Sequence, residues 1–378
     1  MKFKNSIGRG ILSELSEMKI FESAPIKKFF NKFLLVFVLY IVAAASFNGF
    51  FVKWAFCDSE ERYSFEMMFD ETAHRPFVHR QLMLDVARGI SSIIPDNPKA
   101  RLIDHLDRHD EIGTHYSLSK IDSRYTIEYN LVYWMCFFCL LGSVFLWREI
   151  FIELTENKIA GTLAACCFAI IFPIFETVGG YFYDFGELLF FSLATFFALR
   201  GSWLALIIIA PIAEYNKESF LFFVLTMFPF LAVKLGNKKA ALTVIFAAFI
   251  SGLTYLHVSH IYAGNLGGAT EFHLMGHIEE LTQGWLKFEF NYGVLMGQEM
   301  FLPHVLLVAW IVKNSWKQLP EHWKNHVKLA AAINVPLYLL FCSGGELRNL
   351  SMLYMGFIAM LAIFIKNFLT ERSEGLID

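Results

Sequence analysis

The chain has 378 residues, of which 56% are hydrophobic, 17% aromatic and 18% charged, with a formal net charge of -3. Soluble domains carry about 25% charged residues, so this composition argues against a water-soluble enzyme. The 41 Phe exclude a disordered chain, the six Cys exclude a disulfide scaffold, and the small net charge gives no reason to expect a nucleic-acid partner. The composition predicts a polytopic membrane protein.

The chain begins with a basic segment, residues 1–32, which we expect to be cytoplasmic. Residues 33–51 form the first apolar run and have about the 20 residues needed to cross a bilayer. Nine more runs follow, at 126–146, 159–178, 182–199, 203–213, 219–233, 240–257, 301–312, 327–341 and 350–365. The prediction is an all-α fold with about ten membrane helices, some short or broken.

Basic residues predict the orientation, because cytoplasmic loops are enriched in Lys and Arg. A cytoplasmic N-terminus also puts most basic connecting residues inside: Arg148, Lys158, Arg200, Lys234, Lys238, Lys239, Lys313, Lys317, Lys324, Lys328, Lys366 and Arg372. Residues 33–366 then form one membrane domain, and 367–378 form a cytoplasmic tail. Two outer loops, about 58–124 and 259–300, mix apolar and charged residues at helical spacing and predict interfacial helices, including one over 281–290.

The lengths of two apolar pairs place charge inside the membrane. Residues 203–213 and 219–233 flank a polar tip that contains Glu214, Lys217 and Glu218. Measured from the flanking Arg200 and Lys234, each arm has about 14 residues and reaches about 21 Å into a core of about 30 Å, so the tip should lie below the outer surface. Polar backbone at that depth requires a water-filled cavity or burial in protein.

The last pair of runs repeats this geometry, and a third segment adds two carboxylates. Glu346 and Arg348 lie between runs of about 16 residues, or about 24 Å each. Asp184 and Glu187 are three residues apart on one helical face at the outer end of the 182–199 run. Ionisable groups at such depth mark a site or a pathway, or else form structural ion pairs at helix ends.

The first outer loop supplies Asp70, Glu71, His74, Arg75 and Arg80, together with His79. A carboxylate beside Arg and His suits a general base that acts on a hydroxyl next to a phosphate-bearing donor. The alternative is a solvated, salt-bridged interfacial helix.

Metal binding is weakly indicated. His105 and His109, and His273 and His277, have the four-residue spacing that can hold a metal, but neither pair has a complete ligand set. We therefore predict no metal site on these residues, and the sequence leaves open whether a divalent cation is required.

The pattern resembles the GT-C superfamily, polytopic glycosyltransferases that take sugars from polyprenyl-phosphate carriers. The likeness is carried by Asp70 and Glu71 in a long first outer loop, by the charged tip of a broken helical pair at residues 210–220, and by Glu346 and Arg348 before the last helix. The RPFVHRQLM stretch also looks like the basic segment that follows the first-loop acids in several bacterial relatives.

The resemblance implies transfer of a sugar from a lipid-linked donor to an acceptor on the outer face of a bacterial cytoplasmic membrane. Asp70 or Glu71 would be the base, and a set of other residues would bind substrate: His74, Arg75, Arg80, Asp184, Glu187, Lys217, Glu218, Glu346 and Arg348. Two other classes remain open. One is a transporter or flippase of a lipid-linked or anionic substrate. The other is an O-antigen-polymerase-like protein with an outer arginine set, here Arg75, Arg80, Arg88 and Arg101.

Overall fold

The computed structural model describes residues 24–57, 60–108, 122–176, 179–268, 272–298 and 301–374. Within these ranges the protein is almost entirely helical, and the small exception is a two-stranded antiparallel sheet. The predicted helical class is thus confirmed, with one local correction described below.

Among the residues that the structure describes, six helical stretches are long and apolar enough to cross a membrane. They are α2 (Ala24–Trp54), α7 (Thr126–Thr155), α8 (Lys158–Phe175), α9 (Phe182–Arg200), α13 (Asn237–Ile261) and the continuous run of η7 (Leu347–Leu353) and α17 (Tyr354–Glu374). The shorter predicted arms are α10 (Trp203–Asn216) and the broken run of α11 (Phe220–Phe223), η4 (Val224–Met227) and α12 (Phe228–Leu235). The remaining predicted runs fall on α15 (Leu302–Ser315), which η6 (Trp316–Gln318) follows, and on α16 (Glu321–Phe341).

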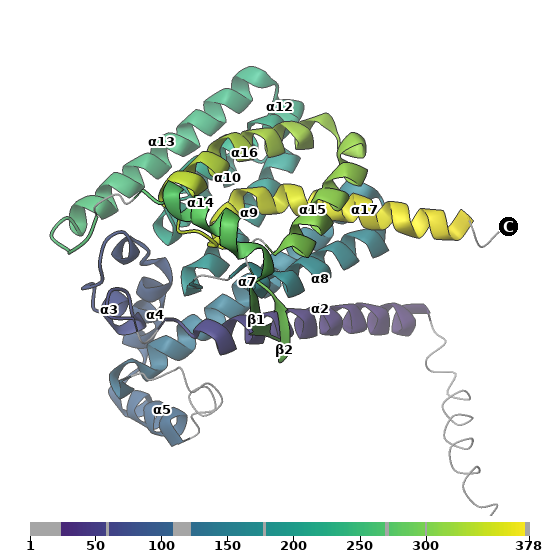
Figure 1. Ribbon diagram of the computed structural model, residues 1–378. Helices are drawn as coiled ribbons and strands as arrows, with labels where there is room; N and C mark the ends of the chain where they lie inside the picture. The colour runs from purple at the N-terminus through teal and green to yellow at the C-terminus, as the bar shows by residue number, and fades with distance from the viewer. Residues whose placement is uncertain are drawn as a thin grey trace, which may run out of the picture.

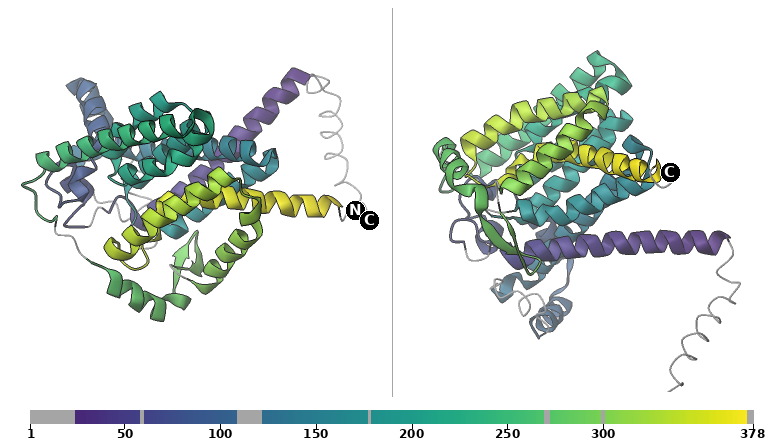
Figure 2. Two further views of the ribbon diagram at one scale, coloured as in Figure 1. Left: turned by 90° about the horizontal axis from the view of Figure 1, so that it is seen from above. Right: turned by 45° about the vertical axis from the view of Figure 1, so that its right-hand side comes forward.

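The first and last helices extend beyond their predicted limits. Helix α2 begins at Ala24, so residues 24–32 of the basic segment are helical, and α17 continues to Glu374 through most of the predicted tail. Residues 1–23 and 375–378 lie outside the described ranges. The start of α2 and the end of α17 lie at one end of the bundle, and the first outer loop lies at the other end (Figure 1). The N-terminal part of α2 projects from the bundle (Figure 2).

The first outer loop folds into short helices, as its spacing predicts. They are α3 (Phe65–Phe69), η2 (Phe77–His79), α4 (Leu82–Ile93), α5 (Asp96–Arg108) and η3 (Ser123–Tyr125). Side chains of α4 bury Met83, Leu84 and Ala87, while Val86 and Ile90 remain exposed. The loop therefore packs as part of the fold.

The second outer loop departs from its predicted helix. Helix α14 (Leu274–Gln283) and η5 (Gly284–Leu286) are followed by β1 (Phe288–Asn291) and β2 (Val294–Gly297), which pair antiparallel. Tyr292 and Gly293 connect the strands with φ of 53° and 75°. Two positive φ angles are typical of the tight turn that suits a right-twisted hairpin, and Gly293 adopts one without steric cost. The turn thus overrides the helical spacing.

An aromatic core joins the long helices. The Phe185 ring of α9 lies 5.2 Å and 4.6 Å from the Phe47 and Phe50 rings of α2, and Phe51 lies 4.9 Å from Tyr133 of α7. Much of the outer surface is also apolar, as on α13, where Leu242 and Ile245 are 60% and 63% exposed. An apolar surface of this size is expected where lipid replaces water.

Gly186 allows α9 to approach the end of α10 closely. A Cβ atom at Gly186 would lie 2.2 Å from Asn216 Oδ1, and buried Asn216 donates from Nδ2 to the Tyr183 carbonyl at 2.9 Å. We expect Gly186→Ala to destabilise the protein by about 1–3 kcal/mol through overpacking. Gly252→Ala on α13 is the matched control, because its Cβ would meet nothing within 4 Å. It should stabilise by about 0.5–1 kcal/mol through helix propensity. Thermal unfolding in detergent compares the two variants, and an equal effect of both would contradict the close approach.

Candidate functional site

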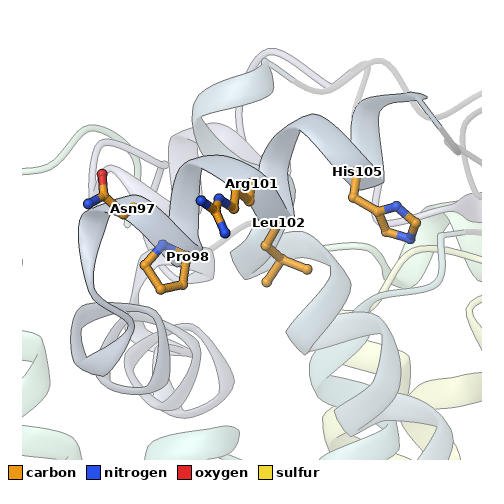
Figure 3. Close-up of a pocket in the computed structure, with 5 residues that line it drawn as sticks. All are labelled: Asn97, Pro98, Arg101, Leu102 and His105. Atoms are coloured by element: carbon orange, nitrogen blue, oxygen red, sulfur yellow. The ribbon is translucent and has the colours of Figure 1, made fainter.

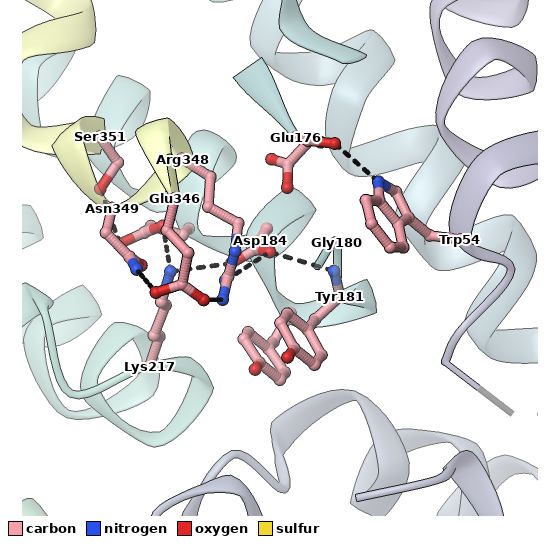
Figure 4. Close-up of polar contacts among 12 residues, drawn as sticks. Trp54, Glu176, Gly180, Tyr181, Asp184, Lys217, Glu346, Arg348, Asn349 and Ser351 are labelled. Atoms are coloured by element: carbon pink, nitrogen blue, oxygen red, sulfur yellow. Dashed lines mark hydrogen bonds and ion pairs between the residues drawn. The ribbon is translucent and has the colours of Figure 1, made fainter. Parts of the chain in front are cut away.

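Charged side chains from four separate segments meet near the first turns of α9. We call this set the charge network, and Figure 4 shows most of its members. It comprises Arg80 after η2, Asp184 and Glu187 of α9, Lys217 and Glu218 between α10 and α11, and Glu346 and Arg348 before α17.

Lys217 lies at the centre of the network. Its Nζ donates to Asp184 Oδ1 at 2.8 Å and to Glu187 Oε2 at 2.7 Å. All three side chains are 3–6% exposed. Glu187 Oε1 also accepts from Ser351 Oγ at 3.0 Å and from Ser219 Oγ at 2.5 Å. A buried ammonium between two carboxylates is stable only because each charge is paired, so this trio is firmly fixed.

The sequence around Asp184 explains its position. Asp184 is the third residue of α9, and its Oδ2 accepts from the Tyr181 backbone N at 3.1 Å. This carboxylate caps one of the free N–H groups at the helix start, where the helix dipole also favours negative charge. The cap leaves the carboxylate free to bind cations from other segments.

Arg348 connects the last helix pair to the same carboxylate. Its Nη1 donates to Asp184 Oδ2 at 3.1 Å, and its Nη2 donates to Glu346 Oε1 at 3.3 Å. Glu346 is held in turn by the Ser343 backbone N at 3.0 Å and by Asn349 Nδ2 at 3.0 Å. Two cations therefore share Asp184.

Arg80 brings the first outer loop into the network. Its Nε donates to Glu218 Oε2 at 2.9 Å, its Nη2 pairs with Glu218 Oε1, and its Nη1 donates to the Tyr183 hydroxyl at 2.5 Å. The charge of Arg80 and the hydrogen bonds from it favour the ionised form of Glu218, so this pair holds Glu218 as an anion.

Two stacked tyrosines lie beneath the cations. The Tyr181 and Tyr183 rings are 5.0 Å apart and nearly parallel. The Arg348 guanidinium lies 4.4 Å from the Tyr181 ring, and Arg80 and Lys217 lie 4.5 Å and 5.7 Å from the Tyr183 ring. Cation–π attraction thus holds three positive groups over one aromatic surface.

The network has a buried interior and a more open rim. Asp184 and Glu187 are 3% exposed, whereas Glu346 is 16% and Glu218 is 29% exposed. Each of the three cations is paired with a carboxylate. An anionic ligand would therefore approach at the rim and replace Glu218 or Glu346 as the partner of an arginine, which binds phosphate with two parallel hydrogen bonds.

The first-loop carboxylates lie in a different cluster. Asp70 Oδ2 accepts from the Tyr125 hydroxyl at 2.6 Å, and Glu71 Oε1 pairs with Arg88 Nη1 at 3.0 Å. Arg88 also pairs with Asp85, which accepts from the Tyr215 hydroxyl of α10. Asp70 and Glu71 are exposed and are not joined to the charge network by an ion pair within the described residues. The two clusters nevertheless meet at the end of α10, where Tyr215 and Lys217 are two residues apart.

Arg75 holds the two outer loops together. Arg75 Nε donates to the Asn265 carbonyl at 2.9 Å, and its Nη2 donates to the Gly267 carbonyl at 2.8 Å. The His74 backbone N donates to the Arg62 carbonyl at 2.9 Å. Arg75 thus donates to backbone carbonyl oxygens, so its guanidinium already has partners when no substrate is bound.

Glu176 is a buried carboxyl that sequence reasoning missed. It follows α8 directly, is 0% exposed, and neither carboxyl oxygen has a hydrogen-bond partner among the described residues. Its backbone carbonyl accepts from Trp54 Nε1 at 2.8 Å. Figure 4 shows its carboxyl on the side of Asp184 and Arg348. The only sequence signal is a lone acidic residue near the end of an otherwise apolar run.

Arg101 lies in a surface hollow on α5 that is lined by Asn97, Pro98, Arg101, Leu102 and His105 (Figure 3). The four arginines proposed for a polymerase-like set are therefore dispersed. Arg75 binds the second loop, Arg80 the charge network, and Arg88 the Asp85 cluster.

The histidine pairs do not form a metal centre in the part of the chain that the structure describes. His277 Nε2 contacts the Tyr338 and Cys342 carbonyl oxygens at 3.1 Å and 2.8 Å, and His105 lines the α5 hollow. His109 lies outside the described residues.

Comparison with known proteins does not assign the chain. No protein-family model matches it, and neither the curated proteins nor the solved structures include a significant match.

Proposed function

We propose that this protein is a membrane glycosyltransferase of the GT-C type, which moves a sugar from a polyprenyl-phosphate donor to an acceptor. The observation that carries the proposal is the charge network: four segments far apart in sequence bring three cations to one aromatic surface at the ends of apolar helices. Buried ionisable groups in a membrane protein are expensive and are expected where a polar ligand binds.

The rim of the network is the proposed donor phosphate site. Arg80 would exchange Glu218, and Arg348 would exchange Glu346, for phosphate oxygens. Lys217 is buried deeper and would add to the positive potential without direct contact. Glycosyl transfer leaves negative charge on the departing phosphate, and fixed cations stabilise that charge as it develops. The polyprenyl tail would lie along the apolar helix surfaces.

The acceptor side of the reaction is assigned to the first-loop cluster. The family resemblance implies Asp70 or Glu71 as the base, and this cluster adjoins the network through the end of α10. The proposal also includes about ten membrane segments, with α15 and α16 added to the six long helices and the two short arms. Both termini would be cytoplasmic in a bacterial cytoplasmic membrane.

A transporter is the second candidate, and the broken run α11–η4–α12 favours it. Interrupted helices whose ends face buried charges are common in transporters. Lys217, shared between two carboxylates, could change partners during an ion or substrate cycle. The glycosyltransferase proposal ranks first because it also uses the exposed carboxylates of the outer loop.

A transfer assay separates the two candidates. Purified protein in liposomes is given radiolabelled polyprenyl-phosphate sugars and a membrane extract as the acceptor pool. The glycosyltransferase proposal predicts labelled glycan product, at a rate that falls in Asp70→Asn or Glu71→Gln. The rate should be unchanged in Asp122→Asn, a control at a partly exposed carboxylate that pairs with Arg124 outside the charge network. Label that enters sealed vesicles without product would favour the transporter.

A further inference from the structure

His79 is a buried side chain with unused hydrogen-bonding capacity. It ends η2, its exposure is 8%, and neither ring nitrogen has a hydrogen-bond partner within the described residues. Buried polar atoms are rarely left without partners, so such an atom calls for an explanation, and a ligand is one. By contrast, buried His277 contacts two carbonyl oxygens.

The surroundings of His79 lie between the two clusters described above. On one side Arg80 follows it directly and binds Glu218. On the other side its ring stacks on Tyr262 at 6.3 Å, and Tyr262 interacts with Glu71 of the first-loop cluster. Tyr255 of α13 contacts the ring edge-on at 6.2 Å. His79 therefore separates the proposed phosphate site from the proposed acceptor site.

The charged groups around His79 shift the pKa of its imidazole in opposite directions. Burial lowers the pKa of the imidazole, Glu218 raises it, and Arg80 and Arg75 lower it, with a net decrease below 6.5. The ring is therefore neutral at pH 7 and has one nitrogen lone pair available to accept a proton. Asp70 and Glu71 differ from it because both are exposed and are already held by Tyr125 and Arg88.

We propose that His79 is the proton acceptor for the acceptor hydroxyl, an inference that rests on the proposed glycosyltransferase function. The hydroxyl O–H bond breaks and its proton moves to a ring nitrogen of His79. The oxygen forms a bond to the anomeric carbon, and the bond from that carbon to the phosphate oxygen breaks. The electron pair leaves with polyprenyl phosphate, whose charge faces Arg80 and Arg348.

The neighbouring anion supports this role. Glu218 stays ionised, so it stabilises the imidazolium that forms when His79 takes up the proton. The imidazolium then returns the proton to water. In this scheme Asp70 and Glu71 position the acceptor instead of serving as the base that the resemblance implies, and His79 is the group that changes its protonation state.

The pH dependence of transfer tests the role of His79. In the wild type, kcat/KM should rise with pH through a pKa below 6.5 and then level off, because only the neutral ring accepts a proton. His79→Gln should lower transfer by about 10²–10⁴-fold and should abolish this rise of kcat/KM at acid pH, the acid limb of the profile. Asp70→Asn and Glu71→Gln should keep the acid limb. The matched control is His277→Gln, also at a buried histidine, which should keep both the rate and the limb.

An NMR measurement without substrate tests the protonation state of His79 separately from sugar transfer. Histidine labelled with ¹³C, followed by NMR in nanodiscs, should give a His79 ring that is neutral at pH 7, with a resonance that is missing in His79→Gln. A His79 ring still protonated at pH 7, or an unchanged acid limb in an active His79→Gln variant, would overturn the inference alone. Wild-type protein that transfers no sugar would overturn the proposed function and this role with it.

Discussion

Replacing Lys217 with methionine should lower the free energy of unfolding by about 3–5 kcal/mol, the largest stability effect that we expect in this chain. The substitution leaves Asp184 and Glu187 buried together without their shared cation, which is 2.8 Å and 2.7 Å from them. Methionine fills a similar volume, so the loss reports the charge. Equilibrium unfolding in mixed detergent micelles measures it.

Two further variants define what this loss means. Lys287→Met removes a more exposed pair with Glu280, whose side chains are 35% and 21% exposed, and should cost about 0–1 kcal/mol. Adding Glu187→Gln to Lys217→Met should recover part of the stability, because Glu187 is the carboxylate left without its cation, whereas Asp184 keeps its ion pair with Arg348. A loss in Lys217→Met no larger than in Lys287→Met would show that the trio is solvated.

A large loss of activity is also expected from Arg348→Gln. Transfer should fall by about 10²–10³-fold, the loss that follows removal of one group that stabilises developing negative charge. Asp184 keeps Lys217 as a partner in this variant, so the fold should survive better than in Lys217→Met. The rate of sugar transfer, measured on protein with a matched melting temperature, checks the expectation.

Arg348→Lys and Arg124→Gln complete that comparison. Lysine keeps the charge but loses the planar guanidinium with its paired donors. The transfer rate of Arg348→Lys should therefore lie between the rates of wild type and Arg348→Gln. Arg124 is 70% exposed and pairs with Asp122 outside the charge network, so Arg124→Gln should leave transfer unchanged. Equal rates for wild type and Arg348→Gln would remove Arg348 from the phosphate site.

The meeting of these charged residues could be predicted from sequence, because the lengths of the apolar runs predict a similar level for them. Lys217 and Arg348 each follow a predicted run shorter than the membrane core, Asp184 lies in the first turn of α9, and the three side chains do meet. Which charged residues pair with each other could not be predicted from run length. It depends on how α9, α10 and η7 pack, as at Gly186 against Asn216.

Residues outside the long helices were harder to place. Asp70 and Glu71 are near Arg80 in sequence, but η2 and the turn around them direct their side chains to Tyr125 and Arg88. The hairpin at Tyr292 was missed because a turn of two residues outweighs the helical spacing around it. Glu176 was missed because it lies within an apolar run and has no charged neighbour in sequence.

Binding of the lipid carrier to the charge network tests the central claim most directly. Native mass spectrometry in nanodiscs should show polyprenyl phosphate bound to the wild-type protein, with polyprenyl alcohol bound far less. Arg80→Gln and Arg348→Gln should each weaken the phosphate lipid by about tenfold or more, as expected when one charged hydrogen-bonding group is lost. Equal binding of the alcohol, or unchanged binding of the phosphate lipid in both variants, would contradict the account.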